Sequence, residues 1–236
     1  LARTTDPLGN STAAQLDYRI LQPWLVTDAN GNRTSVAFDA LGAVAASAVA
    51  GKAGEDVGDS LDGAVVDLTD QQITEYLADP IGNGQELLGS ASNRTLTDYF
   101  AYHRTRHTAT PEPVVVAAIS RDNHHRSGLP PSPRHTLTFS DGFGRAIQTK
   151  DQAEGGQWIT DGWQVLNNKG LAVRAYEPFF TDKPRYEPGQ AVGVSSVFCY
   201  DPSGLPVAVL HPDGTYEKGV PSPWTKAQWD QNDTVL

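Results

Sequence analysis

The sequence has no methionine and one cysteine, and it is poor in aromatic residues (8%) and in charged residues (19%). Because Cys199 stands alone, the chain cannot form an intrachain disulfide. We interpret this thiol as buried and inert, since a reactive thiol requires an exposed, cationic setting that its sequence neighbours do not supply. Because the chain begins with leucine and lacks methionine, we expect it to be an excised or processed piece of a longer protein.

Long apolar runs, a positive net charge and a leader pattern are also absent from the sequence. The longest apolar stretch, residues 40–51, is Ala-rich and shorter than the roughly 18 residues that can cross a bilayer. The formal net charge of -10 gives the surface a negative field, which disfavours a nucleic-acid partner. No charged segment followed by an apolar one opens the chain. The sequence therefore predicts neither a membrane span nor a nucleic-acid interface.

Glycine (22 residues) and proline (16 residues) are plentiful, which favours turns and β structure over long helices. One loose pattern occurs seven times: a residue that favours strands, a polar pair that usually contains Asp or Asn, a glycine, and an alternating strand. Asp and Asn stabilise turns, and glycine supplies positive φ without steric cost. Flanked by alternating apolar residues, Asn-Gly and Asp-Gly are strong hairpin signals. The turn residues that we single out are Gly9, Asn30, Gly31, Gly42, Asp141, Gly142, Gly144, Gly170, Asp201, Gly204, Asp213 and Gly214.

The repeated unit is a turn plus a strand, so neighbouring units should pair into a continuing antiparallel sheet. We predict a mainly β chain, an antiparallel β-hairpin sheet with one or two short helices, as a single segment over residues 1–236. Residues 1–50 and 111–236 are rich in hairpin signals, whereas residues 51–110 read as an insertion that contains a short helix.

The insertion carries the clearest helix signal. Thr69 and Gln72 have the spacing of a capping box, which predicts a helix from about Asp70 to Ala78 that ends before Pro80. The sequence of residues 84–89 predicts another helical turn. Residues 93–105 alternate like a strand, and Ser222 before Pro223 predicts a second short helix near the end of the chain.

Histidines are the side chains that come closest to a catalytic or metal-binding motif. His124 and His125 are adjacent, so on a strand they point to opposite faces, and His135 follows ten residues later. No paired spacing typical of a metal site and no nucleophile or phosphate-binding motif occurs. We therefore predict no enzyme activity, no metal and no cofactor. An enzyme centred on residues 122–135 remains the third hypothesis.

Two tryptophans provide the alternative function. Trp158 and Trp163 bracket a turn at Asp161 and Gly162, and the aromatic segment from Tyr176 to Phe180 follows. Two indoles beside polar residues suit a sugar-binding platform. The same tryptophans can instead cover a sheet edge or close the core between hairpins, an interpretation that we favour. A carbohydrate-binding or other surface-adhesion β module is the alternative.

The hairpin units resemble the YD (Rhs) repeats of polymorphic toxins and related surface proteins. Longer phrases, such as "DYRILQPWLVTDANGNRTSVAFDALG", "FSDGFGRAIQTKDQAE", "GWQVLNNKGLAVRAYEPFF" and "PWTKAQWDQNDTVL", resemble the B component of Tc (toxin complex) insecticidal toxins. The resemblance spans about residues 5–236 and matches the part that follows the propeller region of that component. The matching segments contain no set of catalytic residues, so they indicate a family but do not indicate a reaction.

The resemblance implies a structural role. In that family the B and C components together form a hollow shell, wound from a spiral strip of β-hairpins, around the toxic C-terminal domain of the C component. The implied partners are the remainder of the B component, the C component and, indirectly, the A-component pentamer, in a secreted, extracellular complex. The self-cleaving aspartates of the family belong to the C component, and no segment here matches their surroundings. Asp201 lies in one of the repeated units of turn plus strand, so we assign it to a turn. As a piece of spiral sheet, the chain should expose strand edges and could self-associate through them.

Overall fold

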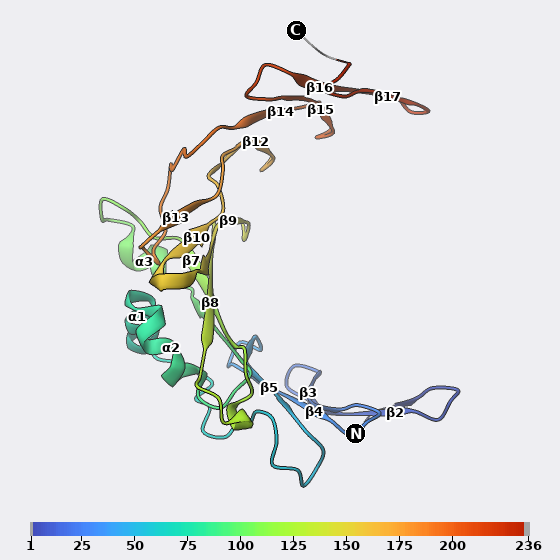
Figure 1. The fold of residues 1–236 in the computed structure, drawn as a ribbon, viewed down its shortest axis with the longest axis vertical. Coiled ribbons are helices and arrows are strands. Elements are labelled where there is room, and N and C mark those ends of the chain that lie inside the picture. The colour runs from blue at the N-terminus through green and yellow to red at the C-terminus, as the bar shows by residue number, and fades with distance from the viewer. Residues whose placement is uncertain (1, 234–236) are drawn as a thin grey trace.

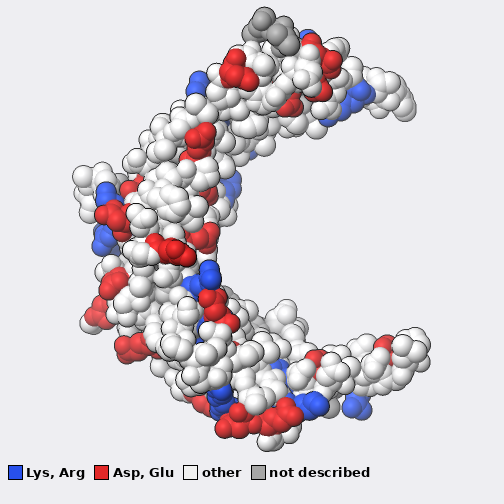
Figure 2. Space-filling view, viewed as in Figure 1, with Lys and Arg blue, Asp and Glu red and all other residues white. Residues whose placement is uncertain are grey.

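The computed structural model describes residues 2–233, which form an open arc of antiparallel strands (Figure 1). The first and the last described strands lie on the two arms of the arc, and the helices lie on its convex side (Figure 1). A space-filling view shows that the concave side is deeply hollowed (Figure 2). The prediction of a mainly β chain with an antiparallel hairpin sheet is confirmed.

Two sheets build the arc, and every strand pair is antiparallel. Along residues 2–181 an eleven-stranded sheet follows the chain order, β1 (Ala2–Thr5), β2 (Ser11–Asp17), β3 (Gln22–Thr27), β4 (Arg33–Phe38), β5 (Val44–Ala50), β6 (Asn93–Asp98), β7 (Val114–Arg121), β8 (Pro133–Ser140), β9 (Ala146–Gln152), β10 (Trp158–Thr160) and β13 (Phe179–Thr181). Along residues 164–229 a six-stranded sheet contains β11 (Gln164–Leu166), β12 (Ala172–Ala175), β14 (Ser196–Tyr200), β15 (Pro206–Leu210), β16 (Tyr216–Pro221) and β17 (Lys226–Trp229).

The turn between β3 and β4 shows how the repeated sequence pattern folds. One carboxylate oxygen of Asp28 accepts hydrogen bonds from the backbone N–H groups of Asn30 (2.9 Å) and Asn32 (2.8 Å). The N–H of Gly31 donates to the carbonyl of Asp28 at 3.0 Å, and Gly31 has φ of 88°. This is a type I turn followed by a left-handed residue that forms a bulge. The left-handed residue is glycine because a Cβ is costly there.

Six further turns have the same backbone geometry. In each, the fourth residue is a glycine with positive φ whose N–H donates to the carbonyl of the first residue; these glycines are Gly9, Gly42, Gly144, Gly170, Gly204 and Gly214. The first residue is an aspartate or asparagine except in the last turn, where His211 takes that place and Asp213 accepts from Thr215 instead. Among the turn glycines that we singled out, Gly142 alone does not have positive φ, because the left-handed position of its turn is Gly144.

The predicted helix forms with the predicted boundaries. α1 (Asp70–Ala78) begins at Thr69, whose side chain accepts from the backbone N–H of Gln72 while the Gln72 side chain accepts from the N–H of Thr69. Pro80 does end this helix, but it also opens α2 (Pro80–Leu88), which is longer than the single turn that we predicted. Pro80 suits the first helical position because its missing N–H has no intrahelical partner there.

Two local predictions were wrong. Residues 93–105 are not one strand, because β6 ends at Asp98 and α3 (Ala101–Thr105) follows. The Asp98 carboxylate accepts from the N–H of Phe100 and pairs with Arg104, which turns the chain away from the sheet. Ser222 caps no helix; its hydroxyl accepts from the N–H of Thr225 in the turn that joins β16 to β17.

The core lies between α1, α2 and the convex face of the central strands. Alternate residues of each strand point to this face, so Val115, Ala117 and Ile119 of β7 are buried together with Leu137 of β8. Tyr76 of α1 closes the cluster with no exposed surface. The helices thus cover one face of the sheet and leave the concave face open (Figure 1).

The turn between β8 and β9 provides a matched test of the repeated geometry. Gly144 has φ of 75° and Gly142 does not have positive φ, yet a Cβ at either residue would meet no atom within 4 Å. We expect Gly144→Ala to lower the free energy of unfolding by about 1 kcal/mol, because alanine is strained in the left-handed region. Gly142→Ala should leave it unchanged or slightly raised. Urea unfolding of both variants measures the difference, and equal effects would contradict the assigned turn.

Candidate functional site

The concave face of the central strands lines the hollow of the arc (Figure 2). Since the residues of β6 to β9 that point at the helices are buried in the core, their sequence neighbours face the hollow. Register places these neighbours directly opposite one another in two rows, which we call the inner rows. The first row is Thr97, Val116, Thr138 and Thr149, and the second is Thr95, Ala118, Thr136 and Asp151.

The inner rows consist mainly of short side chains that end in hydroxyl or methyl groups. Asp151 is the one ionisable member of these rows, and it accepts a hydrogen bond from the hydroxyl of Thr136 at 2.6 Å. Arg134, near the beginning of β8, pairs with Asp122 at 2.7 Å. With its charges paired or hydrogen-bonded, this face offers a polar, nearly neutral lining and no arrangement of nucleophile, base and acid.

On the helix-covered face of the sheet, His135 is the most deeply buried histidine. It is 1% exposed, its Nδ1 lies 2.9 Å from the hydroxyl of Tyr76, and its Nε2 has no hydrogen-bond partner among the described residues. Gly84 of α2 packs on the ring so closely that a Cβ there would lie 2.0 Å from Cε1. Burial lowers the pKa of His135 below its ordinary value of 6.5, because the charged ring would lose its hydration.

The three histidines that suggested a metal site do not converge. His124 and His125 both turn to Asp59, the first through Nδ1 at 3.1 Å and the second through its backbone N–H at 2.5 Å, whereas His135 binds Tyr76. Burial alone would raise the pKa of Asp59, but hydrogen bonds, first among them that from Ser92, outweigh it and hold the pKa below its usual range. Across residues 2–233 no group of three or more His, Cys, Asp and Glu side chains could hold a metal ion.

A buried lysine fastens one of the segments that connect the two sheets. Lys150 of β9 has no exposed side-chain surface, and its Nζ donates to Glu187 Oε2 at 2.6 Å and to the carbonyl of Lys183 at 2.9 Å. Next to it, the side-chain amide of Gln148 donates to the carbonyl of Glu187 and accepts from its N–H. The segment 182–195 runs from β13 of the first sheet to β14 of the second, so these contacts hold one of the connections between the two sheets against β9.

The tryptophans do not form a platform. Trp158 is 1% exposed and belongs to the core cluster, so it cannot stack on a sugar. Trp163 is half-buried and packs near Tyr186, with ring centroids 6.5 Å apart. Trp158 therefore closes the core, as the interpretation that we favoured expects, whereas Trp163 lies outside the core cluster. Cys199 of β14 is half-buried rather than fully buried.

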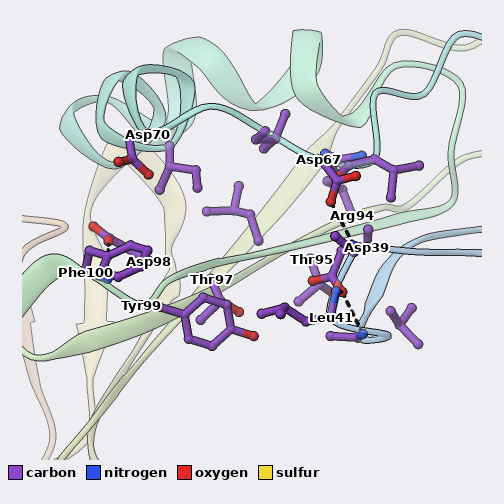
Figure 3. Close-up of a pocket in the computed structure, with 18 residues that line it drawn as sticks. Asp39, Leu41, Asp67, Asp70, Arg94, Thr95, Thr97, Asp98, Tyr99 and Phe100 are labelled. Carbon is purple, nitrogen blue, oxygen red and sulfur yellow. Dashed lines mark hydrogen bonds between the residues drawn. The ribbon is translucent and has the colours of Figure 1, made fainter. Parts of the chain in front are cut away.

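A cavity of about 210 Å³ opens beside the first turn of α1 (Figure 3). It is bounded by the turn at Asp39, the segment before α1, and β6 with the residues that follow it. Four aspartates and one buried arginine, Arg94, share this cavity with apolar side chains; the aspartates are Asp39, Asp67, Asp70 and Asp98. The turn that contains Gly42 borders the cavity through Asp39, Ala40, Leu41 and Ala43.

Solved structures of Tc toxins have the same fold. A crystal structure of TcdB2-TccC3 matches 98% of this chain with a TM-score of 0.76 and 23% sequence identity, and this chain covers 12% of that one. TcdB2-TccC3 without its hypervariable C-terminal region gives a TM-score of 0.75 at 20% identity over 98% of this chain and 14% of the other. A Tc holotoxin pore from Photorhabdus luminescens gives 0.74 at 19% identity over 99% and 14%.

At these identities the likeness shows the fold: this chain folds as a short segment of the Tc toxin structures, in agreement with the resemblance in its sequence. No protein-family model matches the chain, and no curated protein sequence matches it significantly. Among the helices of residues 2–233, none combines the length and the apolar character that a membrane crossing requires.

The buried histidine predicts a pH dependence. Since the unfolded chain binds a proton at His135 more readily than the folded chain does, stability should fall as the pH drops below about 6.5. The loss is limited to roughly 2 kcal/mol by pH 5, the value for a ring that stays neutral when folded. Denaturation curves at several pH values should show a shallower slope for His135→Gln, whereas exposed His125→Gln should keep the wild-type slope. An unchanged slope in His135→Gln would contradict this role.

Lys150 and Lys183 both lie near Glu187, and we expect their replacement to change the free energy of unfolding by unequal amounts. Lys150→Met leaves Glu187 without its buried cation, and we expect it to lower the free energy of unfolding by about 3 kcal/mol. Lys183 also lies near Glu187, at 3.8 Å, but its side chain is 66% exposed, so Lys183→Met should cost less than about 1 kcal/mol. Denaturant unfolding compares the two, and equal losses would show that Lys150 does not fasten this segment.

Proposed function

We propose that this chain is a wall segment of a Tc-toxin B component, which helps to build a hollow shell around the toxic domain of a C component before delivery. The observation that carries this proposal is the match of 98% of the chain to TcdB2-TccC3 at a TM-score of 0.76. Because the chain covers 12% of that structure's chain, it would supply one stretch of wall and would not close a shell by itself.

The two faces of the sheet support a containing role. The helices and the apolar core lie on the convex side, and the inner rows that face the hollow are short, polar and nearly neutral. A lining of this kind offers few apolar or charged groups to an enclosed protein, so it should hold a cargo without binding it tightly. The segment would then act as a barrier and would catalyse no reaction.

The proposed partners follow from the same likeness. The edge strands β1 and β17 present backbone groups that further strands of the B component would pair. The C component would complete the enclosure, and the A-component pentamer would meet the complex through other parts of the B component. The proposed location is outside the producing cell, as part of a secreted toxin complex.

Cysteine labelling tests whether the inner rows line a closed space. In the parent B component with Cys199→Ser, Thr138→Cys places a thiol on the concave face, and Gln71→Cys places one on the exposed surface of α1. A maleimide carried on a large polymer cannot pass through a closed wall. In the assembled complex with a C component, we expect labelling of Gln71→Cys and protection of Thr138→Cys.

The isolated chain supplies the control for this experiment. Without the rest of the shell, its concave face is open, so both cysteines should react with the polymer reagent at similar rates (Figure 2). Equal labelling of both cysteines in the assembled complex would contradict an enclosed inner face. A small maleimide, which diffuses through narrow gaps, verifies that the protected thiol remains reactive.

A further inference from the structure

The connections between the strands of the first sheet lie along two rims, one at each end of the strands. Successive connections of an antiparallel sheet fall at opposite ends, so every second one lies on the same rim. One rim, which we call the aromatic rim, carries the connections 18–21, 39–43, 99–113 and 141–145. Contacts agree with this arrangement: Arg19 donates to the carbonyl of Asp39 at 2.8 Å, and Leu41 lines a cavity together with Tyr99 (Figure 3).

Exposed aromatic side chains follow one another along the aromatic rim. Each is between 48% and 87% exposed, and they are Tyr18, Tyr99, Phe100, Tyr102 and Phe143. The same connections contain four arginines against three carboxylates, although the whole chain has a net charge of -10. A row of exposed apolar groups among polar ones is typical of a surface that another protein covers.

The aromatic rim also has a preformed apolar cavity of about 470 Å³. It lies between the connection that contains α3 and the turn from β8 to β9, and its lining includes Tyr99, Tyr102, Pro113 and Tyr186. Rings and prolines lose little conformational freedom when they are covered, so a cavity built from them favours an apolar ligand.

The opposite rim, which we call the acidic rim, has a different composition. It carries the connections 6–10, 28–32, 122–132 and 153–157 and the start of the insertion, 51–58. These segments contain no aromatic residue, and they hold six carboxylates against Lys52 and Arg126. The two rims are therefore complementary in charge.

The most exposed large apolar side chain of the acidic rim is Leu8, at 89%. It occupies the tip of the turn from β1 to β2, where one carboxylate oxygen of Asp6 accepts from the N–H groups of Leu8 and Asn10, both at 2.9 Å. Pro7 fixes φ beside it. The turn thus presents an apolar tip on a rigid, negatively charged base.

We propose that the aromatic rim docks on the acidic rim of a neighbouring strip of the same repeat, with the apolar tip of an aspartate turn in the cavity at Tyr102 and Pro113. The charge of the two rims and the exposed tip beside carboxylates favour this occupant. The proposal rests on the proposed wall function and deepens it, because it names the rims through which neighbouring strips meet. A contact between two different surfaces repeats without closing on itself, as stacked strips require.

A second copy of the 236-residue chain supplies such a turn, so self-association tests the contact. By sedimentation equilibrium up to about 0.5 mM, where weak contacts are populated, we expect the wild type to associate. Tyr102→Ser and Leu8→Ser should each weaken association about tenfold or more, because each removes one side of the apolar contact. Trp224→Ser removes a side chain that is 93% exposed in the turn from β16 to β17, outside both rims, so it should associate as the wild type does.

Mixing the two defective variants tests whether tip and cavity are partners. Leu8→Ser keeps the cavity and Tyr102→Ser keeps the tip, so an equimolar mixture should form a 1:1 dimer that grows no further. Thermal melting verifies that both variants fold. A monomeric wild type, association that survives either substitution, or a mixture that forms no dimer would overturn the proposal. Pairing through the edge strands β1 and β17 would survive Tyr102→Ser. None of these outcomes changes the labelling result expected for the enclosed inner rows, so the two proposals fail separately.

Discussion

The left-handed glycine at the fourth position of each turn is the constraint on which the arc depends. A type I turn alone splays two strands, and the bulge made by the following left-handed residue restores their pairing. Gly31 shows the arrangement, with the carboxylate of Asp28 holding two N–H groups of the turn. Within the first sheet this unit joins β1 to β2, β3 to β4, β4 to β5 and β8 to β9, and at each of these places it returns the chain beside the previous strand.

The side chains and helices on the two faces of this sheet explain why it remains a single layer of strands. The insertion between β5 and β6 supplies α1 and α2, which cover the convex face of the central strands and bury Leu137 and Tyr76. The concave face receives short polar side chains and remains uncovered. Farther along, Lys150 pairs with Glu187 and holds one of the segments that join the two sheets, and the second sheet continues the arc (Figure 1).

Local chemistry explains which parts of the fold the sequence predicts. The capping box at Thr69 involves residues three apart, so α1 was predicted to the residue, and the seven turns are equally local. The helix after Asp98 was missed because a pairing with Arg104, rather than periodicity, starts it. The burial of Trp158 and the neighbours of Arg94 depend on strand register across the sheet, which no single segment encodes.

An electron cryomicroscopy structure of the assembled B–C complex would test the proposed wall directly. We expect this segment to form part of a closed wall, with α1 and α2 outside and the inner rows, Thr138 among them, facing the enclosed space. A structure in which α1 and α2 face the interior, or in which this segment lies apart from the shell, would contradict it.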